Sequence, residues 1–225
     1  MKLWHISDTH MLHEQLPVPK EIDVVVHSGD ATNYREWWVN RPELDRFILW
    51  FAELPIKHKV FVPGNHDTSL FEGPQNREVF KELGIHLLIE DETEIEGVRF
   101  FGSPWVPRYG DWAFMTDRAR LHRKWEIIPD DTDVLITHGP PFGVLDATYA
   151  RSGDVELAGC RALQKRVFAL QPRLHLFGHV HSHKDIRNTG IRTLSHIPTQ
   201  FSNGSCCDDG NYHTITSQGN ILVIP

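Results

Sequence analysis

Histidine, aspartate and asparagine recur in short clusters along this chain of 225 residues, in combinations that could bind metal ions. The chain holds 15 histidines, which is many for its length, and histidine is the commonest metal ligand in proteins. The clusters are Asp8-Thr9-His10, Gly29-Asp30, Gly64-Asn65-His66-Asp67, His138-Gly139 and Gly178-His179-Val180-His181. Carboxylate, imidazole and amide donors without a thiolate suit Mn, Fe, Zn, Co or Ni, and not a structural zinc cage.

Each cluster has an ordinary explanation when it stands alone. An isolated Asp-x-His or Gly-Asp is more often a tight turn, and Gly-His-x-His could be two surface histidines beside a strand. Here the clusters follow one another along the chain, and each comes directly after a short apolar segment. Their combination indicates one shared site.

The apolar segments predict buried β-strands because they are short and rich in Val, Ile and Phe. They cover residues 3–7, 23–26, 59–62, 134–137 and 174–177. Apolar residues spaced three and four apart predict helices over 42–54, 76–83, 117–125 and 159–170. Alternating strands and helices predict parallel crossovers, and open α/β sheets bind ligands at the carboxyl ends of their strands.

The tail of the chain shows a different pattern. Residues 191–194, 199–202, 213–216 and 221–224 read as strands joined by turns. The tail therefore predicts a second, more antiparallel sheet.

The ordered clusters resemble the calcineurin-like metallophosphoesterase superfamily over residues 8–181. Four further stretches are similar to its MPPED-type phosphodiesterase branch: residues 27–30, 102–105, 137–141 and 203–206. The resemblance implies a four-layer α/β/β/α sandwich of two mixed sheets flanked by helices. We expect residues 1–225 to form a single domain of this kind.

The resemblance also implies two divalent metal ions per chain, with Mn, Fe or Zn expected and Co or Ni as alternatives. One ion would be held by Asp8, His10, Asp30 and His181, and the other by Asp30, Asn65, His138 and His179. Asp30 would bridge the two ions, and a hydroxide shared by them would be the nucleophile. In the same pattern His66 is the acid that protonates the leaving oxygen, with Asp67 holding its ring. Asn65 and His66 would also contact the substrate.

The loop of residues 105–112 is a candidate for binding the substrate. It carries two Trp, a Tyr and an Arg between Pro and Gly residues. Trp105 could stack on a base, and Arg108 could pair with phosphate. The alternative is a structural loop whose aromatic rings cover the core.

The residues after Gly29-Asp30 bear on the substrate class. Protein Ser/Thr phosphatases of the superfamily carry an Asp-Arg pair soon after Gly-Asp, whereas here Gly29-Asp30 continues as Ala-Thr-Asn-Tyr-Arg. We therefore expect a phosphodiesterase that hydrolyses small, nucleotide-type diesters. The alternatives are a phosphomonoesterase or nuclease of the same superfamily, and a non-catalytic module that binds metal or phosphate.

Composition restricts the partners and the location. The net charge of −7 offers no broad basic surface for an extended nucleic acid. The longest apolar run, residues 47–52, is too short to span a membrane, and the first residues leave no room for a signal peptide. Three cysteines, two of them adjacent, do not form a disulfide framework. The sequence thus predicts a cytoplasmic protein.

Overall fold

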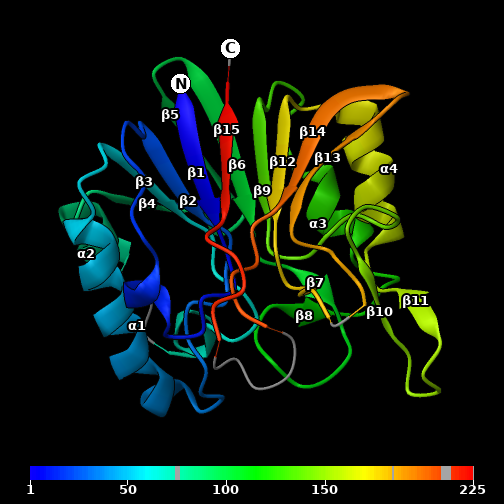
Figure 1. The fold of residues 1–225 in the computed structure, drawn as a ribbon, viewed down its shortest axis with the longest axis horizontal. Coiled ribbons are helices and arrows are strands. Elements are labelled where there is room, and N and C mark those ends of the chain that lie inside the picture. Colours follow the sequence, from blue (N-terminus) through cyan, green and yellow to red (C-terminus); the bar gives the residue numbers. More distant parts are fainter. Residues whose placement is uncertain (74–76, 184, 209–213, 225) are drawn as a thin grey trace.

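The computed structural model describes residues 1–73, 77–183, 185–208 and 214–224, which build two large β-sheets (Figure 1). The first sheet has the strand order β15-β1-β2-β3-β4. Its strands are β1 (Lys2–Ile6), β2 (Val24–His27), β3 (His58–Phe61), β4 (Ile85–Leu87) and β15 (Asn220–Val223). Strands β1 to β4 are parallel, and β15 pairs with β1 in the antiparallel sense. The sheet is therefore mixed, with its antiparallel strand at one edge.

The second sheet has the strand order β13-β14-β12-β9-β6-β5. Its strands are β5 (Asp91–Ile95), β6 (Val98–Ser103), β9 (Val134–Thr137), β12 (Leu174–Phe177), β13 (Gly190–Leu194) and β14 (Ile197–Asn203). The four central strands are parallel, whereas β5 and β13 pair with their neighbours in the antiparallel sense. Two small two-stranded sheets join β7 (Val106–Pro107) to β8 (Met115–Thr116) and β10 (Ala147–Tyr149) to β11 (Val155–Leu157).

The sheets pack face to face, and helices cover their outer faces. Val24 and Val26 of β2 share a buried cluster with Val134 and Leu174 of the second sheet. Val25, which points the opposite way, packs in another cluster with α1 (Trp37–Glu53) and α2 (Arg77–Glu82). The outer face of the second sheet packs on α3 (His122–Glu126) and α4 (Arg161–Leu170). This arrangement confirms the predicted four layers (Figure 1).

The burial on both faces explains why the central strands read as continuous apolar runs. All four residues of β2, β9 and β12 are buried. Strands of a parallel sheet covered by helices on one face and by another sheet on the other have no solvent side to alternate toward. The predicted strands over residues 134–137 and 174–177 match the structure to the residue.

Several predicted boundaries differ from the structure. Helix α1 starts at Trp37, five residues before the predicted start, and contains Pro42 in its interior. The predicted helix over 117–125 is reduced to α3, with turns before it, and residue 76 lies outside the described part. Short helices are hard to delimit because tertiary packing, more than intrinsic propensity, stabilises them.

The prediction that the tail forms a sheet of its own is wrong. Strands β13 and β14 extend the second sheet, and β15 joins the first. Of the predicted strand over 213–216, residue 213 lies outside the described part, and Ile215 makes only an isolated bridge with Cys207. Strand β14 instead pairs with β12, β13 pairs with β14, and β15 pairs with β1, so each tail strand extends a sheet and gains backbone hydrogen bonds.

Candidate metal centre

The predicted ligand residues follow the carboxyl ends of the parallel strands. In the first sheet, β1, β2 and β3 each lead into a turn that carries a ligand, and in the second sheet β9 and β12 do the same. The residues placed in this way are Asp8, His10, Asp30, Asn65, His138, His179 and His181. Six of them come together in two groups, and each group joins residues from both sheets.

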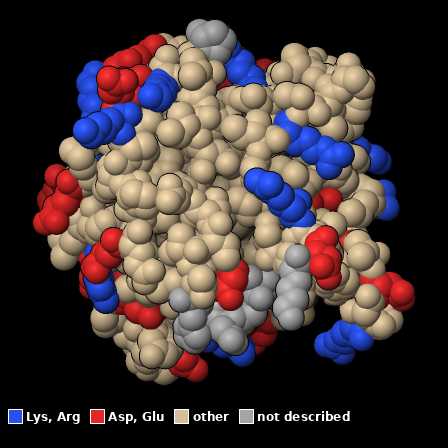
Figure 2. Space-filling view, in the orientation of Figure 1, with Lys and Arg blue, Asp and Glu red and all other residues tan. Residues whose placement is uncertain are grey.

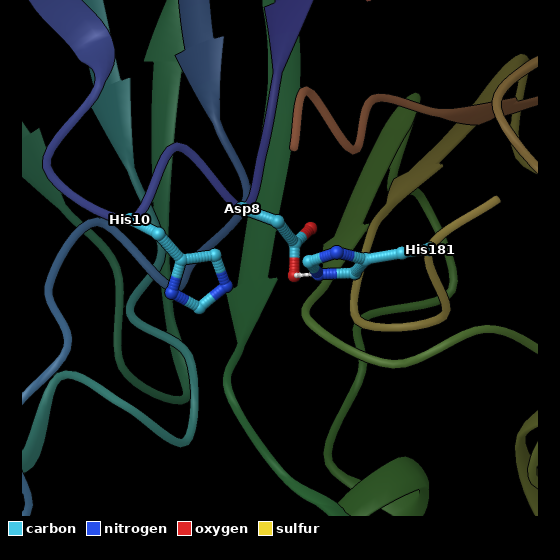
Figure 3. A group of neighbouring side chains, drawn as sticks. All are labelled: Asp8, His10 and His181. Atoms are coloured by element: carbon cyan, nitrogen blue, oxygen red, sulfur yellow. Dashed lines mark hydrogen bonds and ion pairs between the residues drawn. The ribbon is translucent and has the colours of Figure 1, made fainter. Parts of the chain in front are cut away.

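The first group contains Asp8, His10 and His181, whose candidate ligand atoms all lie within 4.8 Å of one another. Nε2 of His181 lies 3.0 Å from Oδ1 of Asp8. Figure 3 shows the Asp8 carboxylate between the two imidazole rings. These residues come from the first and the last of the five motifs, so the group exists only because β1 and β12 end near each other.

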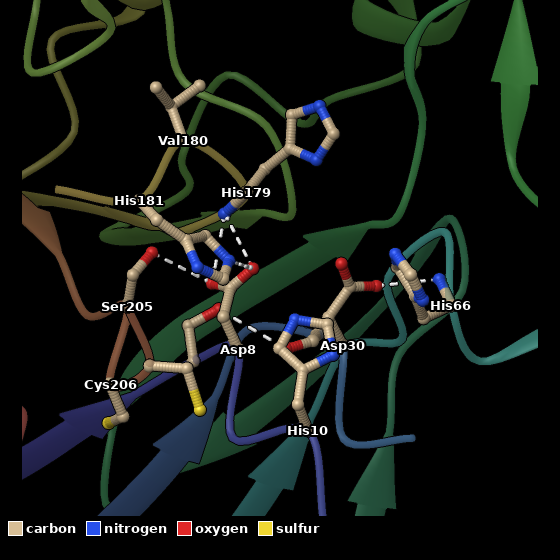
Figure 4. Close-up of polar contacts among 12 residues, drawn as sticks. Asp8, His10, Asp30, His66, His179, Val180, His181, Ser205 and Cys206 are labelled. Carbon is tan, nitrogen blue, oxygen red and sulfur yellow. Dashed lines mark hydrogen bonds and ion pairs between the residues drawn. The ribbon is translucent and has the colours of Figure 1, made fainter. Parts of the chain in front are cut away.

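The second group contains Asp30, His138 and His179, again with ligand atoms within 4.8 Å of one another. Nε2 of His138 lies 3.2 Å from Oδ2 of Asp30 and 3.0 Å from Oδ1 of Asn65. Asp30 also acts on the first group, because its charge influences the pKa of His10. Figure 4 shows Asp30 beside the rings of His10 and His66.

Four of these ligand residues adopt left-handed backbone conformations, which are uncommon for residues other than glycine. The φ angles are 50° at Asp8, 41° at His10, 55° at Asp30 and 68° at His179. Backbone hydrogen bonds hold the turns in place: the Asp8 N–H donates to Gly29 O at 2.8 Å, and the His10 N–H donates to Asp30 O at 3.2 Å. Strained residues of this kind persist where the surrounding structure fixes them, and they cluster at functional sites.

Glycines next to the ligands are required by close contacts. A Cβ atom on Gly64 would lie 2.2 Å from Oδ1 of Asp30, and one on Gly178 would lie 2.0 Å from Oδ2 of Asp8. Larger residues at either position would displace a carboxylate. The glycines of the motifs therefore provide the space in which the ligands converge.

The buried carboxylates of Asp8 and Asp30 give this centre a negative charge that attracts cations. Burial opposes the protonation of His138 and His181, but the carboxylates of Asp30 and Asp8 beside them outweigh it and raise both pKa values to about 9. Burial lowers the pKa of His10 to about 4 and that of His179 to about 3. Buried carboxylates that draw positive charge to themselves, surrounded by neutral imidazoles and an amide oxygen, fit a pair of divalent metal ions.

Comparison with known families supports this interpretation. The family model described as calcineurin-like phosphoesterase matches residues 1–183, a span that includes every candidate ligand. The chain belongs to the calcineurin-like phosphoesterase family. Membership of this family supports a metal-dependent phosphoesterase.

The relatives of this phosphoesterase include proteins of the branch that the sequence motifs resemble. A UPF0046 protein of Caenorhabditis elegans is 37% identical over 94% of this chain and 71% of its own length. Human metallophosphoesterase domain-containing protein 1 is 32% identical over 90% of this chain and 65% of its own length. The chain thus spans roughly two thirds of the length of these relatives. The resemblance to the MPPED-type branch is confirmed.

A solved structure also shares the fold of this phosphoesterase. Phosphopantetheinyl hydrolase from Mycobacterium tuberculosis aligns with a TM-score of 0.51 at 14% identity, over 91% of this chain and 88% of the other. At this identity the likeness shows the fold alone.

None of the helices in the described part of the chain has the length and apolar character that a membrane span requires.

His66 lies beside the ligands of the phosphoesterase. Its ring centroid is 4.9 Å from that of His10 and 4.1 Å from that of Trp112, with an angle of 32° between the planes of His66 and Trp112. Its Nδ1 lies 3.3 Å from the carbonyl oxygen of Asn33, and its backbone N–H donates to Oδ1 of Asp30. The ring is thus held between an aromatic face and the ligand groups, next to where a substrate would bind.

Asp67 has contacts that differ from the predicted one with the His66 ring. Its carboxylate accepts hydrogen bonds from the backbone N–H groups of residues 30–32 and of Gly64, at 2.7–3.2 Å. The hydroxyl of Thr32 donates to it as well, at 2.8 Å. These hydrogen bonds join the turn after β2 to the turn after β3. Asp67 therefore positions Asp30 through the backbone, and the Asn33 carbonyl contacts the ring of His66.

The loop of residues 105–112 reaches the site through different residues from those that the sequence indicated. Trp105 packs against Phe71, Phe114 and the ammonium group of Lys124, so it covers the core. The Arg108 guanidinium turns back toward the carbonyl oxygens of Gly110 and Met115 and toward Asp117, at 3.3–3.6 Å.

Two other aromatic residues of this loop contact the metal-binding residues. The Tyr109 ring lies 5.5 Å from that of His179, and its hydroxyl oxygen lies 3.2 Å from Nδ2 of Asn65. The Trp112 ring packs against that of His66 in a tilted arrangement. The aromatic composition of the loop identified it as a candidate, but composition alone could not tell which rings face inward.

Ser205 also contacts a candidate ligand, although it is not among the site residues predicted from the sequence. Its hydroxyl donates to Oδ2 of Asp8 at 2.9 Å, while the backbone N–H of His179 donates to both oxygens of the same carboxylate at 2.9–3.0 Å. Ser205 lies in the stretch over residues 203–206 that is similar to the MPPED-type branch, so a signal was present in the sequence. Only the hydrogen bond to Asp8 shows that Ser205 can orient a candidate metal ligand.

Proposed function

We propose that this chain is a dinuclear metallophosphodiesterase that hydrolyses small, nucleotide-type phosphodiesters. The observation that carries the proposal is the convergence of the candidate ligands in two adjacent groups, with Asp30 beside both. One ion would be held by Asp8, His10, Asp30 and His181, and the other by Asp30, Asn65, His138 and His179. Mn, Fe or Zn suits these donors best, and Co or Ni is an alternative.

Two bound cations would supply positive charge to the phosphate and an activated water molecule. The chain supplies their fixed arrangement through the turns after β1, β2, β3, β9 and β12. Ser205 and the His179 N–H hold the Asp8 carboxylate, and Asp67 holds the turn that carries Asp30. These hydrogen bonds orient the ligand oxygens before any substrate binds.

His66 is the residue that we propose as the proton donor to the leaving oxygen. The Asn33 carbonyl accepts from Nδ1, which keeps a proton on that nitrogen and leaves Nε2 as the nitrogen that transfers its proton. The tilted contact with Trp112 restricts the orientation of the ring. Protonation of the leaving group matters most for alkoxides such as the ribose oxygens of a nucleotide ester.

The loop after β2 favours a diester over a monoester. The first basic residue after Gly29-Asp30 is Arg35, and it forms an ion pair with Asp111. Its charge is therefore compensated within the protein and is not offered to a dianionic monoester. The net charge of −7 acts in the same direction, although salt screens it beyond ~8–10 Å.

A pocket beside the ligands could hold the organic part of the substrate. It has a volume of about 350 Å³ and is lined by Tyr109, Arg118, Leu157, His179 and His181, among others. Tyr109 is 62% exposed and lines this pocket beside His179. Stacking of a base on such a ring contributes ~1–3 kcal/mol. We assign the stacking role to Tyr109, because Trp105 packs in the core.

The test compares matched p-nitrophenyl mono- and diesters of phosphate, and then cyclic nucleotides, with metal-reconstituted protein. We expect a higher kcat/KM for the diesters. Tyr109→Ala should lower kcat/KM for nucleotides and leave that for small diesters nearly unchanged. A clear preference for the monoester would show a phosphomonoesterase, and absence of turnover with both metals bound would show a binding module.

A further inference from the structure

A basic groove lies between α3 and α4, on the outer side of the second sheet. It has a volume of about 520 Å³, and Arg118, Arg161, Lys165 and Arg166 line it. Glu126 is the one acidic residue among the described residues that line it. In Figure 2 several basic side chains lie on the right-hand side, where Figure 1 places α4. This excess of positive charge stands out in a chain whose net charge is −7.

The groove adjoins the pocket beside the candidate ligands. Arg118 lines both cavities. Its guanidinium donates hydrogen bonds to the carbonyl oxygens of Ala158 and Gly159, each at 3.0 Å, so the side chain is held between the two cavities. A ligand that occupied both cavities would lie alongside Arg118.

Two basic side chains in the groove are available to an anion. Among the described residues, no carboxylate forms an ion pair with Arg161 or Lys165, whereas Arg166 pairs with Asp130 at 2.7 Å. The Arg161 guanidinium lies over the ring of Phe142, 3.4 Å from its centroid, which limits its freedom. Arg161 also stands in the first turn of α4, where the helix adds partial positive charge.

Two buried N–H donors beside the groove lack a hydrogen-bond partner among the described residues. Trp125, which lines the groove, is 1% exposed, and its Nε1–H has no hydrogen-bond partner in the described part of the chain. Nε of Arg166 is also buried and has no hydrogen-bond partner among the described residues. Buried N–H groups without an acceptor are rare and costly.

We propose that this groove binds a second phosphate group of the substrate, while the diester phosphate lies at the metal centre. The inference rests on the proposed diesterase function and deepens it. The substrate class is a small nucleotide diester that carries an additional terminal phosphate. Arg161 and Lys165 are the side chains that would pair with that phosphate, and Arg118 would lie alongside the connecting part.

The test uses two esters that differ in one phosphate group. They are thymidine 5′-(p-nitrophenyl phosphate) and the same ester with a 3′-phosphate. With wild-type protein at low salt, we expect kcat/KM to be about tenfold higher for the 3′-phosphorylated ester, as one charge-assisted contact would give. In Arg161→Gln/Lys165→Gln the ratio of the two kcat/KM values should fall to about one. The matched control Lys20→Gln/Lys81→Gln, which removes the same charge from exposed positions elsewhere, should keep the wild-type ratio.

A binding measurement separates this inference from the proposed function. Calorimetry with thymidine 3′,5′-bisphosphate and thymidine 5′-monophosphate requires no turnover. Tighter binding of the bisphosphate to wild type, lost in Arg161→Gln/Lys165→Gln, would support the groove even if neither ester were hydrolysed. Hydrolysis of both esters at equal kcat/KM, together with equal binding of the two nucleotides, would overturn the groove and leave the diesterase proposal intact.

Discussion

At the scale of single residues, Asp30 has the most demanding position, because its charge acts on both ligand groups. Its Oδ2 lies 3.2 Å from His138, and its charge acts on His10 in the other group. Asp30→Ala should therefore disrupt both metal sites, whereas His10→Ala should mainly weaken one. Elemental analysis of the purified variants measures this. Retention of both metals by Asp30→Ala would contradict the shared role.

His66 is distinguished from the ligands by the reaction step that it would serve. His66→Ala should keep its metals and lose activity by roughly 10²–10⁴-fold on diesters with poor leaving groups. The loss should be smaller for nitrophenyl esters, whose leaving group needs little protonation. His196→Ala, at an exposed histidine outside the site, serves as the control. An equal loss across leaving groups would assign His66 another task.

At the scale of elements, the turn after β12 depends on Gly178. A Cβ atom there would lie 2.0 Å from Oδ2 of Asp8, so Gly178→Ala should displace the carboxylate and lower the metal content of the first group. Overpacking of this kind typically costs about 1–3 kcal/mol of unfolding free energy. Metal analysis and thermal unfolding of the same preparation measure both effects.

Gly84→Ala is the matched comparison for this turn. Gly84 has a φ of 69° and no other atom within 4 Å of an added Cβ, so it tests backbone strain alone. We expect Gly84→Ala to lose about 1–2 kcal/mol of stability and to keep both metals. If Gly178→Ala also kept both metals, the close approach of this turn to Asp8 would not matter for the site.

At the scale of the whole molecule, metal binding should be linked to pH. The pKa values of His138 and His181 are raised to about 9, from an ordinary value of 6.5, so their protonation stabilises the metal-free fold. That contribution is fully present below pH 6.5 and is lost as the pH rises through 9. Divalent ions bound at the proposed sites would replace these protons and stabilise the folded state that binds them.

The difference in Tm between metal-loaded and chelator-treated protein should therefore widen from pH 6.5 to pH 9. Metal titration of the apoprotein at pH 7.5 should also release protons into a weakly buffered solution. Both measurements report on the intact site and need no substrate. A Tm difference that is constant over this pH range would show that these histidines do not exchange protons for metal.

Much of the candidate site follows from local features of the sequence. Short apolar strands that end in Asp, His, Asn and Gly are visible without a structure, because strand formation, turn formation and ligand chemistry depend on neighbouring residues. Parallel strands then bring their carboxyl ends to one edge. This is why the clusters of candidate ligands could be predicted, although Asp8 and His181 are far apart in the chain. The four-layer fold and the division of the ligands between two ions came from the resemblance to the family.

Tertiary structure decided the features that depend on contacts between distant segments. The tail strands pair with the edges of two existing sheets, and the Asp67 carboxylate binds the backbone of residues 30–32. Tyr109 and Trp112 face the ligands while Trp105 packs in the core, although all three share one aromatic loop. Composition sets what a side chain can do, but its direction and partners depend on packing against the rest of the fold, which no local pattern encodes.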